Sequence, residues 1–154
     1  MGSRTPKLDL DVQVAVRGRE LPTRRQLRAW ASAALEHDAE VALRIVDDGE
    51  GLRLNSDYRG RNTATNVLTF AYSEDIELPP GMPMSGDIVL CAPVVENEAR
   101  AQGKTLEAHY AHLVVHGMLH LQGYDHERDD EARAMEARES EILAKLGYPD
   151  PYSA

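Results

Sequence analysis

The order of the periodic patterns along this 154-residue chain restricts its fold more than any other feature. Apolar and polar residues alternate over residues 8–16, which is the period of a half-buried strand. Apolar runs predict three further strands, at residues 41–46, 67–72 and 88–91. The longest helical patterns, residues 105–121 and 129–146, follow all of these. Strands early and helices late predict an α+β fold with about four strands.

Capping residues mark the helix boundaries. Thr23 with Gln26 three residues later is the pattern of a capping box, so a helix is expected to follow Thr23. Thr105 is the expected cap of the helix over residues 105–121. Gly103 and Gly147 stand where the helices before them should end, because glycine tolerates the left-handed conformation of a helix exit.

Composition is that of a globular protein without disulfides. The hydrophobic share of 42% excludes a disordered chain, and the length suits one domain over residues 1–154. The single Cys91 cannot form an internal disulfide, which favours a reducing compartment. We find no apolar stretch of signal-peptide or membrane-spanning type in the sequence. We therefore expect a cytoplasmic protein.

The net charge of -9 is unevenly distributed. Residues 1–61 hold eleven Lys and Arg against ten Asp and Glu, so the acidic excess lies in the rest of the chain. The acidic residues of the last helix and its approach are expected to form a solvated face: Glu127, Asp129, Asp130, Glu131, Glu136, Glu139 and Glu141. An acidic total argues against a nucleic-acid ligand unless a local basic surface exists.

Three histidines near the end of the helix over residues 105–121 predict a metal site. His116 and His120 are four residues apart, so their side chains project from one face of the helix. Gly123 allows the helix to stop and the chain to present His126. Three neutral imidazoles suit zinc and leave a fourth position for water, whose pKa the metal lowers towards about 7. We expect one Zn²⁺ per chain, with Ni²⁺ or another divalent metal as the alternative.

Other interpretations of this segment stay open. The histidines can be a cluster without metal, or ligands of a closed structural site with Asp125 as the fourth ligand. Because adjacent residues have difficulty reaching the same ion, Asp125 is expected to support the site or its turn instead. His109 and His112 lie on nearly the same stripe as His116, where they either hydrogen-bond to the site or substrate, or pack in the interior.

The spacing of the histidines is that of the metzincin proteases, with one decisive difference. Position 117 is glycine, where zinc proteases carry the glutamate that acts as general base. Peptide hydrolysis by the usual route would therefore lack its proton acceptor. A metalloprotease is disfavoured by Gly117.

The segment from His116 to His126, with its Gly-Tyr-Asp-His end, resembles the signature of the YbeY family of bacterial endoribonucleases and rRNA maturation factors. Residues 54–60 with residues 65–70, and residues 85–89, resemble two further blocks of that family in the same order. Thr69 stands where serine is common, and this exchange keeps the hydroxyl.

The resemblance implies a mixed sheet flanked by helices and a zinc ion held by His116, His120 and His126. It implies a single-strand-specific endoribonuclease that matures the 3′ end of 16S rRNA and takes part in 70S ribosome quality control. The implied partners are ribosomal RNA and the small ribosomal subunit, together with ribosomal proteins or assembly GTPases. A ribosome-assembly or RNA-binding factor with a structural metal is the alternative.

The resemblance places Arg59 near the metal. A guanidinium there would stabilise the charge that gathers on the non-bridging oxygens during phosphodiester cleavage. The alternative is a surface ion pair of Arg59 with Asp57 or Glu50. Arg61 and His112 are further expected contacts of the RNA.

The remaining roles are left open by the sequence. His116 is expected to be both a ligand and part of the catalytic centre. His109 and Asp87 are candidates for supporting the site, and Asp87 serves as general base only if the fold brings it close. Either water or the RNA 2′-hydroxyl can be the nucleophile. RNA binding should depend on a basic channel built from the first sixty residues, including Arg17, Arg24 and Arg28.

Overall fold

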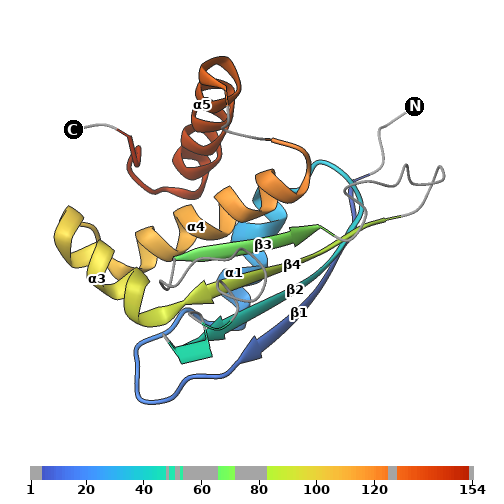
Figure 1. Ribbon diagram of the computed structural model, residues 1–154. Helices are drawn as coiled ribbons and strands as arrows, with labels where there is room; N and C mark the ends of the chain where they lie inside the picture. The colour runs from blue at the N-terminus through green and yellow to red at the C-terminus, as the bar shows by residue number, and fades with distance from the viewer. Residues whose placement is uncertain are drawn as a thin grey trace.

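A mixed four-stranded sheet forms one layer of the molecule (Figure 1). The computed structural model describes residues 5–47, 49–50, 53, 66–71, 83–124 and 128–152. The strands lie in the order β1 (Leu8–Val14), β2 (Ala39–Val46), β4 (Met84–Cys91) and β3 (Val67–Ala71). β2 pairs in parallel with β1 and with β4, whereas β3 is antiparallel to β4. The predicted α+β fold with a small mixed sheet is confirmed.

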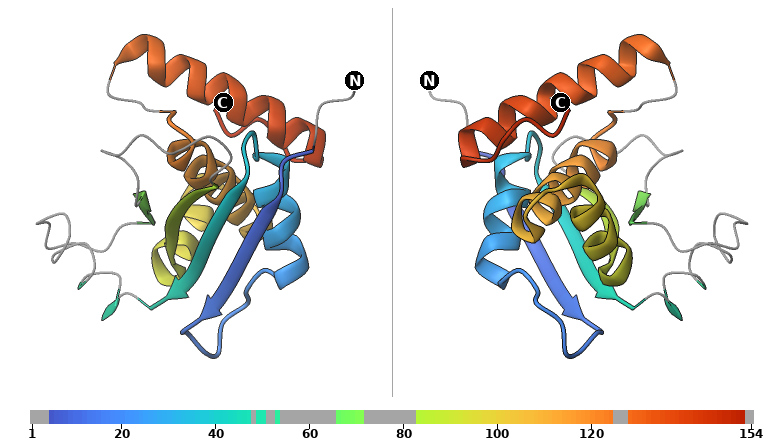
Figure 2. Two further views of the ribbon diagram at one scale, coloured as in Figure 1. Left: turned by 90° about the vertical axis from the view of Figure 1, so that its right-hand side faces the viewer. Right: turned by 90° about the vertical axis from the view of Figure 1, so that its left-hand side faces the viewer.

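Helices cover one face of this sheet. They are α1 (Arg24–Ala33), α3 (Ala92–Gln102), α4 (Leu106–Leu121) and α5 (Asp129–Leu146). α1 contacts β1, α4 contacts β3 and β4, and α5 packs on α4 and α1. Figure 2 shows α5 lying across the top of the molecule, above α1 and α4. The helix that carries the histidines is therefore enclosed between the sheet and α5.

The helix ends follow the capping pattern of the sequence. The Thr23 hydroxyl accepts from the Gln26 amide at 3.0 Å, while the Gln26 side chain accepts from the Thr23 amide at 2.9 Å. The Thr105 hydroxyl caps α4 by accepting from the Ala108 amide at 3.1 Å. Gly103 and Gly147 close α3 and α5 with φ of 67° and 93°. These boundaries are local properties of the chain.

Two glycines allow α4 to approach the sheet closely. A Cβ atom on Gly86 of β4 would lie 2.7 Å from Cδ2 of Leu121, and one on Gly117 of α4 would lie 3.2 Å from Cδ1 of Ile88. Neither position has room for an ordinary side chain without movement of its neighbour. The second half of α4 is thereby held against β4.

In the part of the chain that the structure describes, no helix is long and apolar enough to cross a membrane.

Candidate metal centre

His116 and His120 lie one turn apart on α4 and are both half-buried. The Nδ1 atom of each ring is engaged by an acceptor. His116 Nδ1 lies 2.5 Å from Oε1 of Glu139 on α5. His120 Nδ1 lies 3.1 Å from the backbone carbonyl oxygen of Tyr124. Because a carbonyl only accepts, the His120 Nδ1 carries a hydrogen, and in the neutral ring the lone pair is then on Nε2.

The turn after α4 supplies the acceptor for His120. Gly123 has a φ of 105°, and the Tyr124 amide donates to the Leu119 carbonyl at 3.1 Å. This positive φ ends the helix where the sequence predicted. It also turns the Tyr124 carbonyl back towards His120. The glycine thus shapes the site as well as ending the helix.

Glu139 is the centre of a buried hydrogen-bond network. Its side chain is fully buried and accepts from His116, from His112 Nε2 at 3.2 Å, and from the hydroxyl of Tyr152. Burial alone would raise the pKa of Glu139, but the hydrogen bonds from His112, His116 and Tyr152 outweigh it and lower the pKa to about 2. Burial and the Glu139 carboxylate raise the pKa of Tyr152. Glu139 is therefore an ionised acceptor, and Tyr152 a donor, near neutral pH.

The expectation that Glu139 belongs to a solvated acidic face is wrong. It lies on the inner side of α5 with Met135, Ile142 and Leu143, all of which are buried. The spacing of these four positions is that of a buried helical stripe. This spacing could have predicted that residue 139 is buried, although its charge favoured an exposed position.

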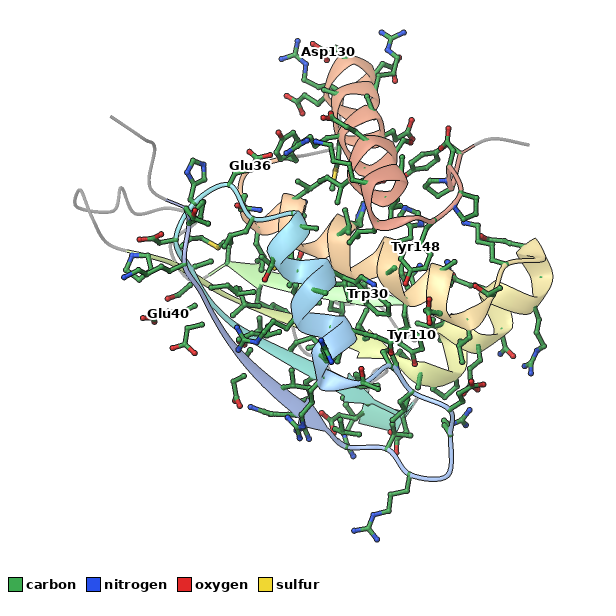
Figure 3. All side chains as sticks on the ribbon, turned by 180° about the vertical axis from the view of Figure 1, so that it is seen from behind. Trp30, Glu36, Glu40, Tyr110, Asp130 and Tyr148 are labelled. Carbon is green, nitrogen blue, oxygen red and sulfur yellow. The ribbon has the colours of Figure 1, made fainter. Side chains whose placement is uncertain are left out.

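A second network holds the Tyr124 segment. The Tyr124 hydroxyl donates to Glu36 at 3.0 Å, and Arg138 Nε of α5 donates to the same carboxylate at 3.2 Å. Figure 3 shows Glu36 in the connection that follows α1, beside α5. The Gln122 side chain also binds this connection, by accepting from the Glu36 amide at 2.6 Å and donating to the Ala34 carbonyl at 2.7 Å. None of these partners was predicted from the sequence.

The two predicted ligands that the structure describes, His116 and His120, fit a metal site. Each has its Nδ1 occupied by a hydrogen bond, which is the arrangement that metal-binding histidines adopt in proteins. Among the described residues there is no group of three side chains placed to hold a metal ion. His126, the predicted third ligand, and Asp125 lie outside the described residues. The imidazoles of His116 and His120 are donors that zinc accepts readily.

The other residues predicted to contact the RNA, and the predicted alternative partner Glu50, have different outcomes. Arg59 and Arg61 fall outside the described residues. Glu50, the alternative partner of Arg59, forms a bidentate ion pair with Arg44, whose Nε and Nη2 donate to the two carboxylate oxygens at 2.5 and 3.0 Å. His112 contacts Glu139 and the Tyr152 hydroxyl, each at 3.2 Å.

His109 and Asp87 are separated from the histidine pair. His109 is buried, and its Nε2 lies 2.9 Å from a Glu98 oxygen at the contact of α3 with α4. Gly86 and Ile88 face α4, so the side chain of Asp87 between them projects from the opposite face of the sheet. Asp87 is thus not brought to His116 as a general base.

Comparison with known proteins identifies the family. The family model described as endoribonuclease YbeY matches residues 14–147. The endoribonuclease YbeY of Nitrosospira multiformis is 59% identical over an alignment 157 positions long, which covers 96% of this chain and 82% of the relative. That of Paraburkholderia phymatum is 55% identical and covers 97% of this chain and 99% of the relative.

This chain belongs to the YbeY family. The predicted family is confirmed, and so is the expectation of an enzyme from an endoribonuclease family. The solution structure of a Thermotoga maritima protein superimposes with a TM-score of 0.54 at 24% identity, over 93% of this chain and 99% of that chain. This likeness supports the fold alone.

Proposed function

We propose that this YbeY-family chain is a zinc-dependent, single-strand-specific endoribonuclease. The observation that carries the proposal is the pair of histidines on α4, each with Nδ1 bound to an acceptor, at 2.5 and 3.1 Å. In their neutral form both rings therefore carry the Nε2 lone pair that a metal needs. The name of the relatives supplies the reaction class.

In the proposed site His116, His120 and His126 hold one zinc ion. Zinc supplies Lewis acidity, which stabilises negative charge on a phosphodiester. Arg59 and Arg61 provide guanidinium groups that bind the non-bridging oxygens of the scissile phosphate. Among the described residues, Glu139 and the Tyr124 carbonyl orient the two rings of α4.

A basic cavity offers a path for the RNA backbone despite the acidic total charge. It has a volume of about 610 Å³ and lies between the β1–α1 connection, α3 and the start of α4. Its cationic lining residues are Arg17, Arg19, Arg100 and Lys104, and its acidic ones are Glu20 and Glu96. Arg19 is paired with Glu96, so the unneutralised charge rests mainly on the other three cations.

Two arginines of the expected channel have other partners. Arg24 donates to the Val12 carbonyl at 2.7 Å, and Arg28 to the Leu8 carbonyl at 3.4 Å. Both support β1. The proposed RNA path therefore uses Arg100 and Lys104 in their place.

We propose that the enzyme acts in the cytoplasm, where it matures the 3′ end of 16S rRNA and takes part in 70S ribosome quality control. This assignment rests on the family. Ribosomal RNA and the small ribosomal subunit are the proposed partners, together with ribosomal proteins or assembly GTPases.

A cleavage assay on single-stranded RNA tests the proposal. We expect cleavage by the purified protein, its loss on addition of a chelator, and its recovery with zinc. His120→Ala should lower the rate by at least about 100-fold, since removal of a ligand disrupts the metal site. His37→Ala is the matched control, because His37 is exposed and contacts Gln122 only through its backbone amide, at 3.2 Å.

Cleavage that is as strong in His120→Ala as in the wild type would come from a contaminating nuclease and would refute the proposal. Specific RNA binding without any metal-dependent cleavage would favour the assembly factor with a structural metal. Elemental analysis of protein purified without a nickel column identifies the bound metal.

A further inference from the structure

Glu139 is an acidic residue at a position of α5 whose neighbours are apolar and buried. Its side chain is fully buried on the apolar stripe of α5, between Met135 and Ile142. Burying a carboxylate carries a desolvation penalty that well-placed donors only offset. An apolar residue at this position would fill the stripe without that penalty. The role of the carboxylate therefore depends on the groups to which it binds.

The two carboxylate oxygens of Glu139 divide their partners. Oε1 accepts from His116 Nδ1 at 2.5 Å. Oε2 accepts from His112 Nε2 at 3.2 Å and from the Tyr152 hydroxyl. One oxygen thus contacts the proposed metal ligand, while the other is held by two donors that do not belong to the ligand set.

We propose that Glu139 is a positioning residue of the metal centre, which keeps the His116 ring in the tautomer with hydrogen on Nδ1 and the lone pair on Nε2. The metal-binding part of this inference rests on the proposed function. His112 and Tyr152 act one step further away, by fixing the carboxylate. In this proposal Glu139, His112 and Tyr152 do not contact the reacting phosphate.

The C-terminal segment is folded to complete the network. After Gly147 the chain turns back along α5, and the Asp150 carboxylate accepts from the Ser140 hydroxyl and from the Tyr152 amide, each at 2.9 Å. These two bonds place Tyr152 beside Glu139. Residues 147–152 therefore contribute to the metal centre, although they are far from His116 in the sequence.

Zinc affinity and the His116 tautomer test the proposal together. In Glu139→Gln the side chain keeps its shape but offers one acceptor oxygen and one amide group that donates. His116 is then free to accept on Nδ1 and to carry its hydrogen on Nε2. We expect zinc affinity, measured by competition with a chromophoric chelator, to fall about 10- to 100-fold. Nitrogen-15 NMR of the metal-free protein should show a shift of His116 towards the Nε2–H form.

Glu98→Gln is the matched control. Glu98 also binds a histidine of α4, since its Oε1 lies 2.9 Å from His109 Nε2. It is also a glutamate that binds a histidine ring, but it lies on α3, is partly exposed, and contacts the first half of α4. Glu98→Gln should leave zinc affinity within about twofold of the wild type and leave the His116 tautomer unchanged.

Glu139→Asp keeps the charge but shortens the side chain by one methylene group, and it should weaken zinc binding as Glu139→Gln does. It serves as the deciding variant if Glu139→Gln fails to fold. Tyr152→Phe should weaken zinc binding less than either, because the bond to His116 remains.

Wild-type zinc affinity in the folded Glu139 variants, or a His116 that stays Nδ1–H in them, would overturn the proposal. An equal loss of affinity in Glu98→Gln would also overturn it, because the effect would then be a general one of losing a carboxylate. If the wild-type protein neither binds zinc nor cleaves RNA, the proposed function fails. The tautomer comparison in the metal-free protein still decides whether Glu139 positions His116.

Discussion

Position 117 lies on the side of α4 that faces the sheet. It is buried, and a Cβ atom there would lie 3.2 Å from Cδ1 of Ile88. The sequence identified Gly117 as the residue that replaces the general base of zinc proteases. The structure adds that this position points into the core and away from solvent.

Gly117→Glu should therefore destabilise the fold and confer no protease activity. The introduced carboxylate would be buried against the apolar side chain of Ile88. Because burying a charge without an ion-pair partner is unfavourable, we expect the free energy of unfolding to fall by about 3 kcal/mol or more. Urea denaturation measures this loss, and a casein assay tests for proteolysis.

Gly117→Ala is the control for Gly117→Glu. Alanine gains helix propensity of about 1 kcal/mol over glycine, which offsets a tight contact with the buried side chain of Ile88. We expect a net change in unfolding free energy within about 1 kcal/mol. A Gly117→Glu protein as stable as the alanine variant would contradict the close approach of α4 to β4.

The end of α4 is held by the side chain of Gln122. Gln122, the residue after the last turn, donates to the carbonyls of Ala34 and Met118 and accepts from the amides of Glu36 and His37, at 2.6 to 3.2 Å. A single side chain thus joins the end of α4 to the α1–β2 connection. It neighbours the turn whose Tyr124 carbonyl binds His120.

Gln122→Ala should lower the free energy of unfolding by about 1–3 kcal/mol, because it leaves backbone groups of that connection without their partners. Thermal or urea denaturation measures the loss. Gln102→Ala on α3 is the control, since Gln102 is exposed and its removal should change stability by less than about 0.5 kcal/mol. Equal stability of the two variants would contradict a joining role for Gln122.

α5 is attached to the rest of the helical layer at its C-terminal end. The Tyr148 hydroxyl accepts from Trp30 Nε1 at 3.2 Å and donates to Glu107 at 2.7 Å. Figure 3 labels Trp30 on α1 and Tyr148 beyond α5, with α4 alongside them. These contacts fix the end of the helix that carries Glu139.

At the scale of the whole molecule, charge is separated between two regions. α5 begins with Asp129, Asp130 and Glu131, whereas the lining of the cavity beside α3 has four cations against two acidic residues. An acidic protein can bind RNA when its cations gather on one surface, because the phosphate contacts are local.

Arg17→Ala and Lys104→Ala should each weaken binding of single-stranded RNA, and each should reduce the slope of log affinity against log salt by about 0.7 for one lost phosphate contact. Lys145→Ala is the control, since Lys145 is an exposed cation near the end of α5 that pairs with Glu141, at 3.4 Å. Titrations at several salt concentrations measure the slopes. Unchanged slopes in the first two variants would place the RNA path elsewhere.

The stability of the whole protein should depend on pH through His109. Burial lowers the pKa of His109, although the hydrogen bond to Glu98 opposes this, and Lys104 and His112 lower it further. The unfolded chain takes up a proton near pH 6.5, whereas the folded protein resists protonation until the pH is lower. The contribution is therefore complete above about pH 6.5 and is lost as the pH falls through the folded pKa.

His109→Gln should make the free energy of unfolding fall less between pH 7 and pH 5 than it does in the wild type. Urea denaturation at a series of pH values measures the difference, and exposed His37→Gln is the control. A wild-type pH dependence in His109→Gln would show that His109 titrates alike in the folded and unfolded states.

The sequence by itself determined the features that depend on a few neighbouring residues. The capping box at Thr23, the helix exit at Gly123 and the shared face of His116 and His120 all follow from local hydrogen bonding and helical spacing. The fold class followed from the order of the strand-like and helical periodic patterns along the chain.

Only the tertiary structure decided which partners orient the histidines. Glu139 is 23 residues from His116 and lies on another helix, and β4 takes its place between β2 and β3 although it follows both in the chain. Contacts at such separations depend on how the elements pack, which no short pattern encodes. The same residue type can be a solvated acid or a buried acceptor, and packing on the inner side of α5 makes Glu139 the latter.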